Sequence, residues 1–197
     1  MKSSLGQTWK IIIGLILAIA ATRFNHFGSA FSLPDASWAV FFLGGLYLAR
    51  YPRTALAVFT MLLLQAGLMD SYVTTVQGVS DWCMTPAYWF LIPTYGSLWL
   101  VGRWFAMHHS MNHKGWAWLT LSAWIANSFA FFLSNASFYL VSGRVSEMTA
   151  TEYISRVSEY YVSYVSMSML YIAVIVGILS LFSEIKNSKV NAQGFIN

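Results

Sequence analysis

The chain has 197 residues, of which 57% are hydrophobic and only 9% are charged, and its formal net charge is +4. A soluble domain carries roughly 25% charged residues, so this chain has too few charges to cover a surface that faces water. The composition excludes an ordinary soluble protein and predicts one all-α transmembrane domain over residues 1–197, with the lipid bilayer as its solvent. Because no basic run is interleaved with aromatic residues, we expect no nucleic-acid partner.

Six apolar segments predict six transmembrane helices, because a helix needs about 20 mostly apolar residues to cross a bilayer. Charged or turn-forming residues separate these segments, which lie at 9–21, 33–49, 54–69, 85–104, 116–133 (or as far as 140) and 160–182. We expect the third segment to stop at Asp70 and the fourth to be interrupted by Pro93.

The distribution of charge indicates how the helices are oriented. With both termini on one side of the membrane, that side holds eight of the eleven basic residues, and the other holds only Arg23, Arg144 and Arg156. Six of the seven acidic residues fall on that second side. Since basic residues collect in cytoplasmic segments, both termini of this multi-pass membrane protein are expected in the cytoplasm.

A second interpretation of the first apolar segment stays open. Lys2, the apolar run from Ile11 and the triplet at 18–20 also resemble a signal peptide with its cleavage site. Cleavage there would leave five helices, with the amino terminus outside.

The connections on the two sides of the membrane differ in length. Those on the outer side, at 22–32, 70–84 and 141–159, are longer than those on the inner side, at 50–53 and 105–115. Long loops on a rigid scaffold usually carry binding sites, so we expect a ligand on the outer face.

Cys83 is the only cysteine, which excludes an intrachain disulfide and any metal site built from several cysteines. It lies just before the fourth predicted helix, and the partial positive charge of a helix amino terminus favours a thiolate. A thiolate is a soft ligand that suits soft or borderline metals. The alternative is that Cys83 is a small apolar residue that fills space at the membrane edge.

Three polar residues near the outer ends of the predicted helices are further candidates for ligand contact. Asp70 opens the same connection as Cys83 and could accept a hydrogen bond, or it could simply mark a helix end. Tyr88 lies near the outer end of the fourth helix, where tyrosine also occurs in the aromatic belt. Arg156 could bind a carboxylate, an amide or a phosphate, or could pair with Glu152 or Glu159 on a helix face.

The histidines and the apolar segments offer little catalytic chemistry. His109 and His113 have the spacing that brings two imidazoles together on a helix, but no third metal ligand is near, so a solvated inner loop is the better interpretation. His26 follows the first helix on the outer side. The predicted helices are expected to lack buried ionisable residues of the kind that mark ion-coupled transporters and proton relays.

Gly14, Ala18 and Thr22 form a ridge of small residues on the first predicted helix. Such a ridge lets another helix approach closely, and it serves either internal packing or a partner protein.

The sequence resembles the S components of energy-coupling-factor vitamin transporters, and within that group the solitary cobalamin-transporting BtuM-type proteins of Gram-negative bacteria. The resemblance covers nearly the whole chain. Its most specific element is the lone cysteine in Asp81-Trp82-Cys83-Met84-Thr85-Pro86, between the third and fourth helices.

This resemblance implies an S-component-like fold, with cobalamin (vitamin B12) captured on the periplasmic side and taken up across the inner membrane. It implies that Cys83 ligates the cobalt and that Asp70, Tyr88 and Arg156 contact the corrin side chains. S components dock on their coupling partner through an AxxxA pattern, for which this chain offers Gly14-x-x-x-Ala18 or Ala18-x-x-x-Thr22. That departure leaves open whether an energy-coupling ATPase module takes part at all.

Two questions about activity remain open from the sequence. A transporter is the first expectation, with or without removal of the upper axial ligand of cobalamin by the thiolate. The alternative is a membrane-bound redox protein that holds haem or a metal through Cys83 or the histidines. Haem-carrying bundles usually place histidines inside facing helices, whereas all four histidines here lie at or beyond predicted helix ends.

Overall fold

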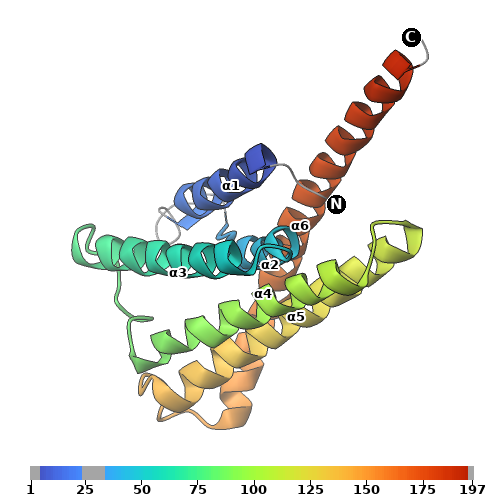
Figure 1. Cartoon of the computed structure of the whole chain (residues 1–197). Coiled ribbons are helices and arrows are strands. Elements are labelled where there is room, and N and C mark those ends of the chain that lie inside the picture. The colour runs from blue at the N-terminus through green and yellow to red at the C-terminus, as the bar shows by residue number, and fades with distance from the viewer. Residues whose placement is uncertain (1–4, 24–33, 195–197) are drawn as a thin grey trace.

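A computed structural model describes residues 5–23 and 34–194 of the chain, and it describes the side chains of residues 6–23, 34–112 and 114–182. The protein is all-α, as predicted, and the described residues form six α-helices and one short 3₁₀ helix, η1 (Figure 1). The elements are α1 (Leu5–Arg23), α2 (Ser37–Leu48), α3 (Pro52–Thr75), η1 (Pro86–Phe90), α4 (Leu91–His108), α5 (His113–Val141) and α6 (Ala150–Gly194).

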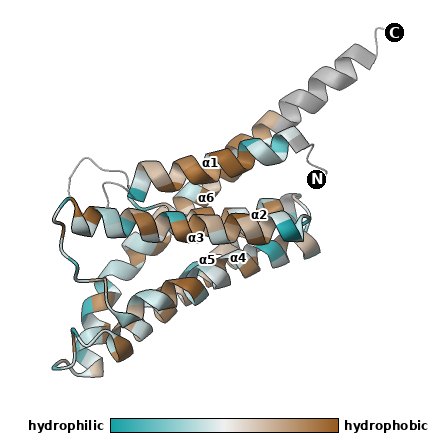
Figure 2. Cartoon of the chain, turned by 60° about the vertical axis from the view of Figure 1, so that its left-hand side comes forward, coloured by the Kyte–Doolittle hydropathy of each residue, from teal (hydrophilic) through white to brown (hydrophobic). Residues whose placement is uncertain are grey.

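Three helices are long and apolar enough to cross a membrane by length and composition: α3, α5 over Lys114–Val141 and α6 over Ala150–Phe182. Large apolar side chains such as Leu68 and Val162 are exposed along them, which water would penalise. Figure 2 shows hydrophobic residues along much of the length of the helices. These features indicate a multi-pass membrane protein and support three of the six predicted spans.

Consecutive α-helices run in alternating directions along the bundle. In Figure 1 α1 begins and α6 ends on the right, where the α2–α3 and α4–α5 connections also lie. The α3–η1 and α5–α6 connections lie at the other end. The two longer described connections, at 76–85 and 142–149, therefore share one end of the molecule.

α3 and α6 extend beyond their predicted limits towards the end that carries the connections at 76–85 and 142–149. α3 does not stop at Asp70 but continues to Thr75, because the carboxylate of Asp70 is paired inside the protein rather than turned to water. α6 begins at Ala150 instead of residue 160. Its start is fixed by a capping box, in which the Thr149 backbone N–H donates to the Glu152 carboxylate (2.9 Å) and the Glu152 N–H donates to Oγ1 of Thr149 (3.3 Å).

The fourth predicted helix is divided into η1 and α4 at Leu91. Pro86 opens η1, where a missing N–H costs little. Pro93 lies in the first turn of α4, and a proline ring clashes with the carbonyl four residues earlier. A regular α-helix therefore cannot run through this segment, as the position of Pro93 predicted.

α2 is the central helix and packs against α1, α3, α4 and α6. Its closest neighbour is α4, because glycines remove the side chains that would hold the two backbones apart. A Cβ atom on Gly45 would overlap the backbone carbonyl of Trp99, and one on Gly102 would overlap the carbonyl of Phe42. Small residues at a helix contact allow this close approach in membrane proteins.

We expect Gly45→Ala to lower the free energy of unfolding by about 1–3 kcal/mol, because the added methyl group meets rigid backbone. The measurement is the thermal unfolding midpoint of the detergent-solubilised protein. Gly177→Ala on α6 is the matched control, since a Cβ there meets no atom within 4 Å of it. Equal stability of the two variants would contradict the close α2–α4 packing.

The predicted ridge on α1 divides into two parts. Gly14 is exposed, with no described atom within 4 Å of a Cβ placed on it. Thr22 is buried, and its Oγ1 donates to the Ala18 carbonyl (2.7 Å) and accepts from the Ala36 N–H (3.1 Å). The end of the ridge at Thr22 therefore serves internal packing.

The histidine segment is a connection, as its loop interpretation predicted. α4 ends at His108, so His109 and His113 do not share one helix. His109 stacks on Phe105 and Trp118, with ring centroids 5.3 and 5.2 Å away. The side chain of His113, and all of His26, lie outside the described residues.

Candidate functional site

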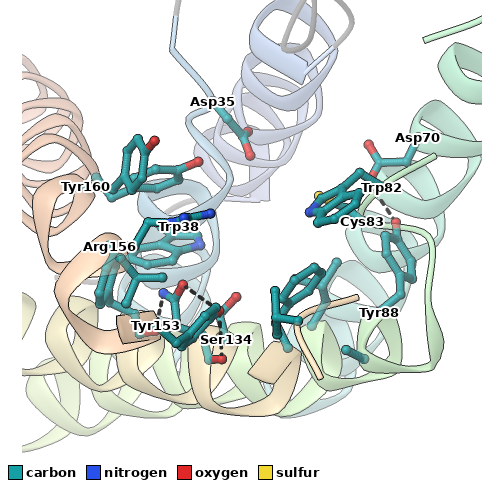
Figure 3. A pocket seen from close by; sticks show the side chains of 18 of the residues that line it. Asp35, Trp38, Asp70, Trp82, Cys83, Tyr88, Ser134, Tyr153, Arg156 and Tyr160 are labelled. Atoms are coloured by element: carbon teal, nitrogen blue, oxygen red, sulfur yellow. Dashed lines mark hydrogen bonds between the residues drawn. The ribbon is translucent and has the colours of Figure 1, made fainter. Parts of the chain in front are cut away.

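A cavity of about 520 Å³ opens at the end of the bundle that carries the two longer described connections (Figure 3). All six α-helices, η1 and both connections contribute to its lining. Much of the wall is aromatic, with contributions from Trp38, Tyr88, Phe131, Phe138, Tyr160 and Tyr164. The volume lies within the range of typical ligand sites, roughly 300–1,000 Å³.

The four residues predicted from the sequence as ligand contacts all line this one cavity. Cys83 comes from the α3–η1 connection, Asp70 from α3 and Tyr88 from η1, and they lie together on one side in Figure 3. Arg156 lies across the cavity on α6, not in a loop as predicted. Among the described residues, Arg156 has no ion-pair or hydrogen-bond partner within contact distance, although its charge interacts with the carboxylate of Glu152. Its guanidinium can therefore still meet a ligand in the cavity.

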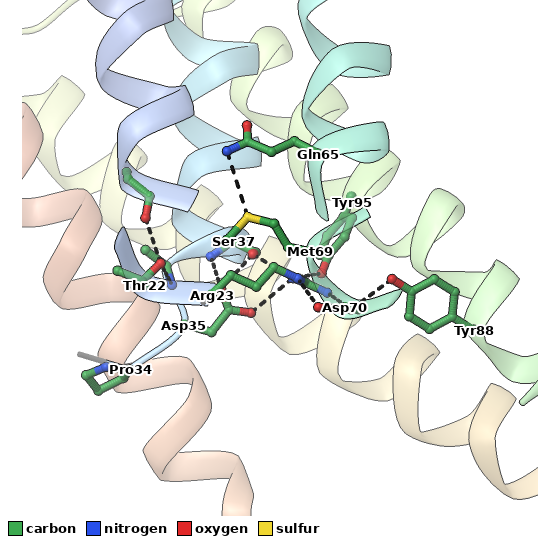
Figure 4. Close-up of polar contacts among 12 residues, drawn as sticks. Thr22, Arg23, Pro34, Asp35, Ser37, Gln65, Met69, Asp70, Tyr88 and Tyr95 are labelled. Atoms are coloured by element: carbon green, nitrogen blue, oxygen red, sulfur yellow. Dashed lines mark hydrogen bonds and ion pairs between the residues drawn. The ribbon is translucent and has the colours of Figure 1, made fainter. Parts of the chain in front are cut away.

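A buried ionic cluster borders the cavity on the side of Asp70 (Figure 4). Arg23 at the end of α1 holds the Asp70 carboxylate in two parallel bonds, Nε to Oδ1 at 2.7 Å and Nη2 to Oδ2 at 2.6 Å. Its Nη1 also lies 3.3 Å from Oδ2 of Asp35. Both Arg23 and Asp70 are only 5% exposed. Removing one member of such a pair leaves an uncompensated buried charge, which costs about 3–5 kcal/mol.

Hydroxyl groups complete the cluster around the guanidinium. Nη1 of Arg23 donates to Oγ of Ser37 (2.8 Å) and to the hydroxyl of Tyr95 (2.9 Å). Tyr88 donates its hydroxyl proton to Oδ2 of Asp70 (2.8 Å). The expectation that the helices contain no buried ionisable residue was therefore wrong. Arg23 was assigned to a loop, because its partners lie far away in the sequence.

Aromatic rings form the wall opposite the ionic cluster. Trp38 contacts Phe131 and Tyr164, with ring centroids 6.5 and 5.9 Å away, and so joins α2, α5 and α6. Ring pairs at these separations add packing energy and hold each other's orientation. The wall therefore offers flat apolar faces at fixed positions.

Arg144 links the two connections that border the cavity. Its guanidinium lies 3.6 Å from the carboxylate of Asp81 and 5.4 Å from the ring centre of Trp82. Trp82 also contacts Phe138 of α5, with the ring centroids 6.5 Å apart. The segment that carries Cys83 is thus held against the α5–α6 side of the cavity.

Cys83 is exposed, and it lies in a turn in which the Thr85 N–H donates to its carbonyl (3.0 Å). The protein around the thiol removes part of its water, which raises its pKa, and the negative charge of Asp70 raises that pKa further. The expectation of a thiolate favoured by a helix amino terminus was therefore wrong for the free protein. The reason is that Cys83 precedes a five-residue 3₁₀ helix and lies close to a carboxylate.

We expect alkylation of Cys83 to follow a pH profile shifted above that of an ordinary cysteine. Only the thiolate reacts, so raising the pKa lowers the rate at neutral pH by about tenfold per unit of pKa. The measurement is the rate of iodoacetamide labelling from pH 6 to 10, which reports one site because the chain has one cysteine. The denatured protein is the control, and a native profile that levels off at or below the denatured one would contradict the prediction.

Several residues of the cavity were missed from the sequence. Arg23 and Asp35 are part of the ionic cluster, and Trp38 and Tyr160 form part of the wall. One signal pointed to the cluster: Arg23 directly follows an apolar helix on the acid-rich side of the predicted topology. A cation in that position needs a carboxylate, but the sequence alone does not show which one.

The described side chains contain no group of three or more His, Cys, Asp or Glu residues placed to hold a metal ion. Within that part of the chain, Cys83 therefore belongs to no metal site built from three or more such side chains.

No model of a known protein family matches the chain, and no curated protein matches it either.

Proposed function

We propose that this protein binds cobalamin on the outer side of the bacterial inner membrane and mediates its uptake, with Cys83 as a ligand of the cobalt. The observation that carries the proposal is the single cavity lined by Cys83, Asp70, Tyr88 and Arg156. Those residues come from four separate segments of the chain, and they are the four to which the resemblance to BtuM-type transporters assigns corrinoid binding.

A corrinoid matches the donor set of the cavity. Cys83 supplies one soft ligand, and a corrin ring supplies the equatorial ligands of cobalt itself, leaving an axial position for the protein. A metal held in this way needs no cluster of protein ligands.

The walls of the cavity also suit this substrate. The rings of Trp38, Phe131 and Tyr164 offer apolar faces to a flat macrocycle, and polar groups at the edges meet its amide side chains. Cobalamin is larger than the 520 Å³ cavity, so part of it would extend beyond the exposed Trp82 and Arg156 at the rim.

Coordination by Cys83 is coupled to a proton. The thiol of the free protein has a raised pKa, and only the thiolate binds cobalt, so binding releases a proton and grows stronger as pH rises towards that pKa. With cyanocobalamin, the Co–S bond would form as the Co–C bond to cyanide breaks. Cyanide leaves with its electron pair and takes the thiol proton as HCN, so no change in oxidation state is needed.

The proposed topology is that of an S component, with six spans and both termini in the cytoplasm. The alternating helix directions in Figure 1 support it, because they bring the start of α1 and the end of α6 to the same end of the bundle. The cavity then opens to the periplasm. The proposal allows transport either by the protein alone or with an energy-coupling ATPase module.

The positions of the described histidines do not support the alternative of a haem or metal redox protein. His108 and His109 lie at the end of α4, whereas the cavity is lined by Leu91 and Tyr95 near its start. In the described part of the chain, the histidines therefore lie away from Cys83.

The absorption spectrum of the bound vitamin tests the role of Cys83. We expect wild-type protein to shift the bands of cobalamin relative to the free vitamin, because sulfur replaces an axial ligand. Cys83→Ser, which differs by one atom, should bind with the spectrum of unliganded corrinoid. Size-exclusion chromatography verifies that the variant is folded, and identical bound spectra for the two proteins would remove the thiolate from the proposal.

Growth of a bacterial strain that lacks its own cobalamin uptake tests transport. At limiting cobalamin, expression of wild-type protein should restore growth that depends on the vitamin, and Cys83→Ala should restore less. Equal membrane levels of the two proteins are the control. If wild-type protein did not restore growth and the purified protein contained no corrinoid, the proposed function would be refuted.

A further inference from the structure

The carboxylate of Asp70 is already occupied by the protein. It accepts two bonds from Arg23 and a third from the hydroxyl of Tyr88 (2.8 Å). An ionised carboxylate has about four acceptor positions, and the side chain of Asp70 is only 7% exposed. Asp70 therefore has little capacity and little access to accept hydrogen bonds from a ligand.

Tyr88 is placed differently, although it belongs to the same network. It is half-buried, lines the cavity, and points its hydroxyl towards Asp70 in Figure 3. Because its proton is committed to Asp70, the hydroxyl oxygen retains lone pairs that can only accept. The group that a ligand meets here is thus a neutral acceptor whose orientation is fixed by a buried charge.

Resting on the proposed function, which already makes Tyr88 a ligand contact, we infer that its hydroxyl acts as a hydrogen-bond acceptor. We infer further that Arg23 and Asp70 do not touch the ligand themselves but are positioning residues that act through Tyr88. Arg23 holds both oxygens of Asp70, and Asp70 holds the proton of Tyr88. The matching ligand group is an N–H donor. On a corrinoid these donors are the primary amides at the edge of the ring.

The planar guanidinium of Arg23 is suited to this role. Two parallel bonds fix both the position and the rotation of the Asp70 carboxylate, which a single bond would leave free to turn. Lysine would keep the charge but not this geometry. Further bonds from Nη1 to Ser37 and Tyr95 fix the guanidinium in turn.

A pair of corrinoids that differ in their N–H groups tests the inference. Dicyanocobinamide carries primary amides around the ring, whereas the heptamethyl ester of dicyanocobyrinic acid carries esters with no N–H. We expect Tyr88→Phe to weaken binding of dicyanocobinamide by about 5- to 10-fold, the effect of one hydrogen bond, and to leave the ester within about twofold. Equal losses for both corrinoids would overturn the assignment of Tyr88.

A double-mutant cycle separates positioning from direct contact. Asp70→Asn should weaken dicyanocobinamide binding by about 3- to 10-fold in the native background and by less than about twofold in the Tyr88→Phe background. Arg23→Lys should follow the same pattern. A loss that persists without the Tyr88 hydroxyl would show direct contact and overturn the positioning role.

The ester also distinguishes positioning from a purely structural role, since damage to the fold would weaken both corrinoids together. If one of the variants Asp70→Asn and Arg23→Lys does not fold, the cycle with the other one decides the positioning role. Tyr88→Phe with the two corrinoids decides the acceptor role of Tyr88 in either case, because Phe leaves the Arg23–Asp70 pair intact. Wild-type protein that binds neither corrinoid would refute the proposed function itself. Wild-type binding with equal losses refutes only the assignment made here.

Discussion

The ion pair between Arg23 and Asp70 is the constraint on which the cavity depends. A buried guanidinium is tolerated only when its donors are satisfied, and here they reach Asp70 on α3, Ser37 on α2 and Tyr95 on α4. One side chain at the end of α1 therefore fixes the relative positions of four helices. The same network places Tyr88 against the cavity, so the site and the fold share this cluster.

The sequence was sufficient for the features that depend on local pattern. Apolar runs predicted the helices, and Pro93 predicted the change from η1 to α4. The errors lie where distant residues meet. Asp70 was expected to end α3 because an unpaired carboxylate is more stable in water than in the membrane. The helix continues because Arg23, 47 residues earlier in the chain, neutralises that carboxylate.

The site shows the same limit. The family resemblance predicted ligand contacts at Cys83, Asp70, Tyr88 and Arg156, and all four line one cavity. The structure also pairs Asp70 with Arg23, a partner that no spacing rule predicts. For Cys83, a helix start favoured the thiolate, whereas the nearby carboxylate and partial loss of water favour the thiol. The local and the tertiary effects on the thiol pKa have opposite signs, and the net shift is upward.

The glycines between α2 and α4 have a mechanical consequence. With Gly45 and Gly102 in backbone contact across the two helices, neither helix can slide or tilt against the other without a steric clash. Tyr95 of α4 also stacks flat on Phe41 of α2, 4.2 Å between centroids, directly behind the cavity. These two helices form a rigid unit, so any rearrangement that widens or narrows the cavity has to come from the helices and loops that surround them.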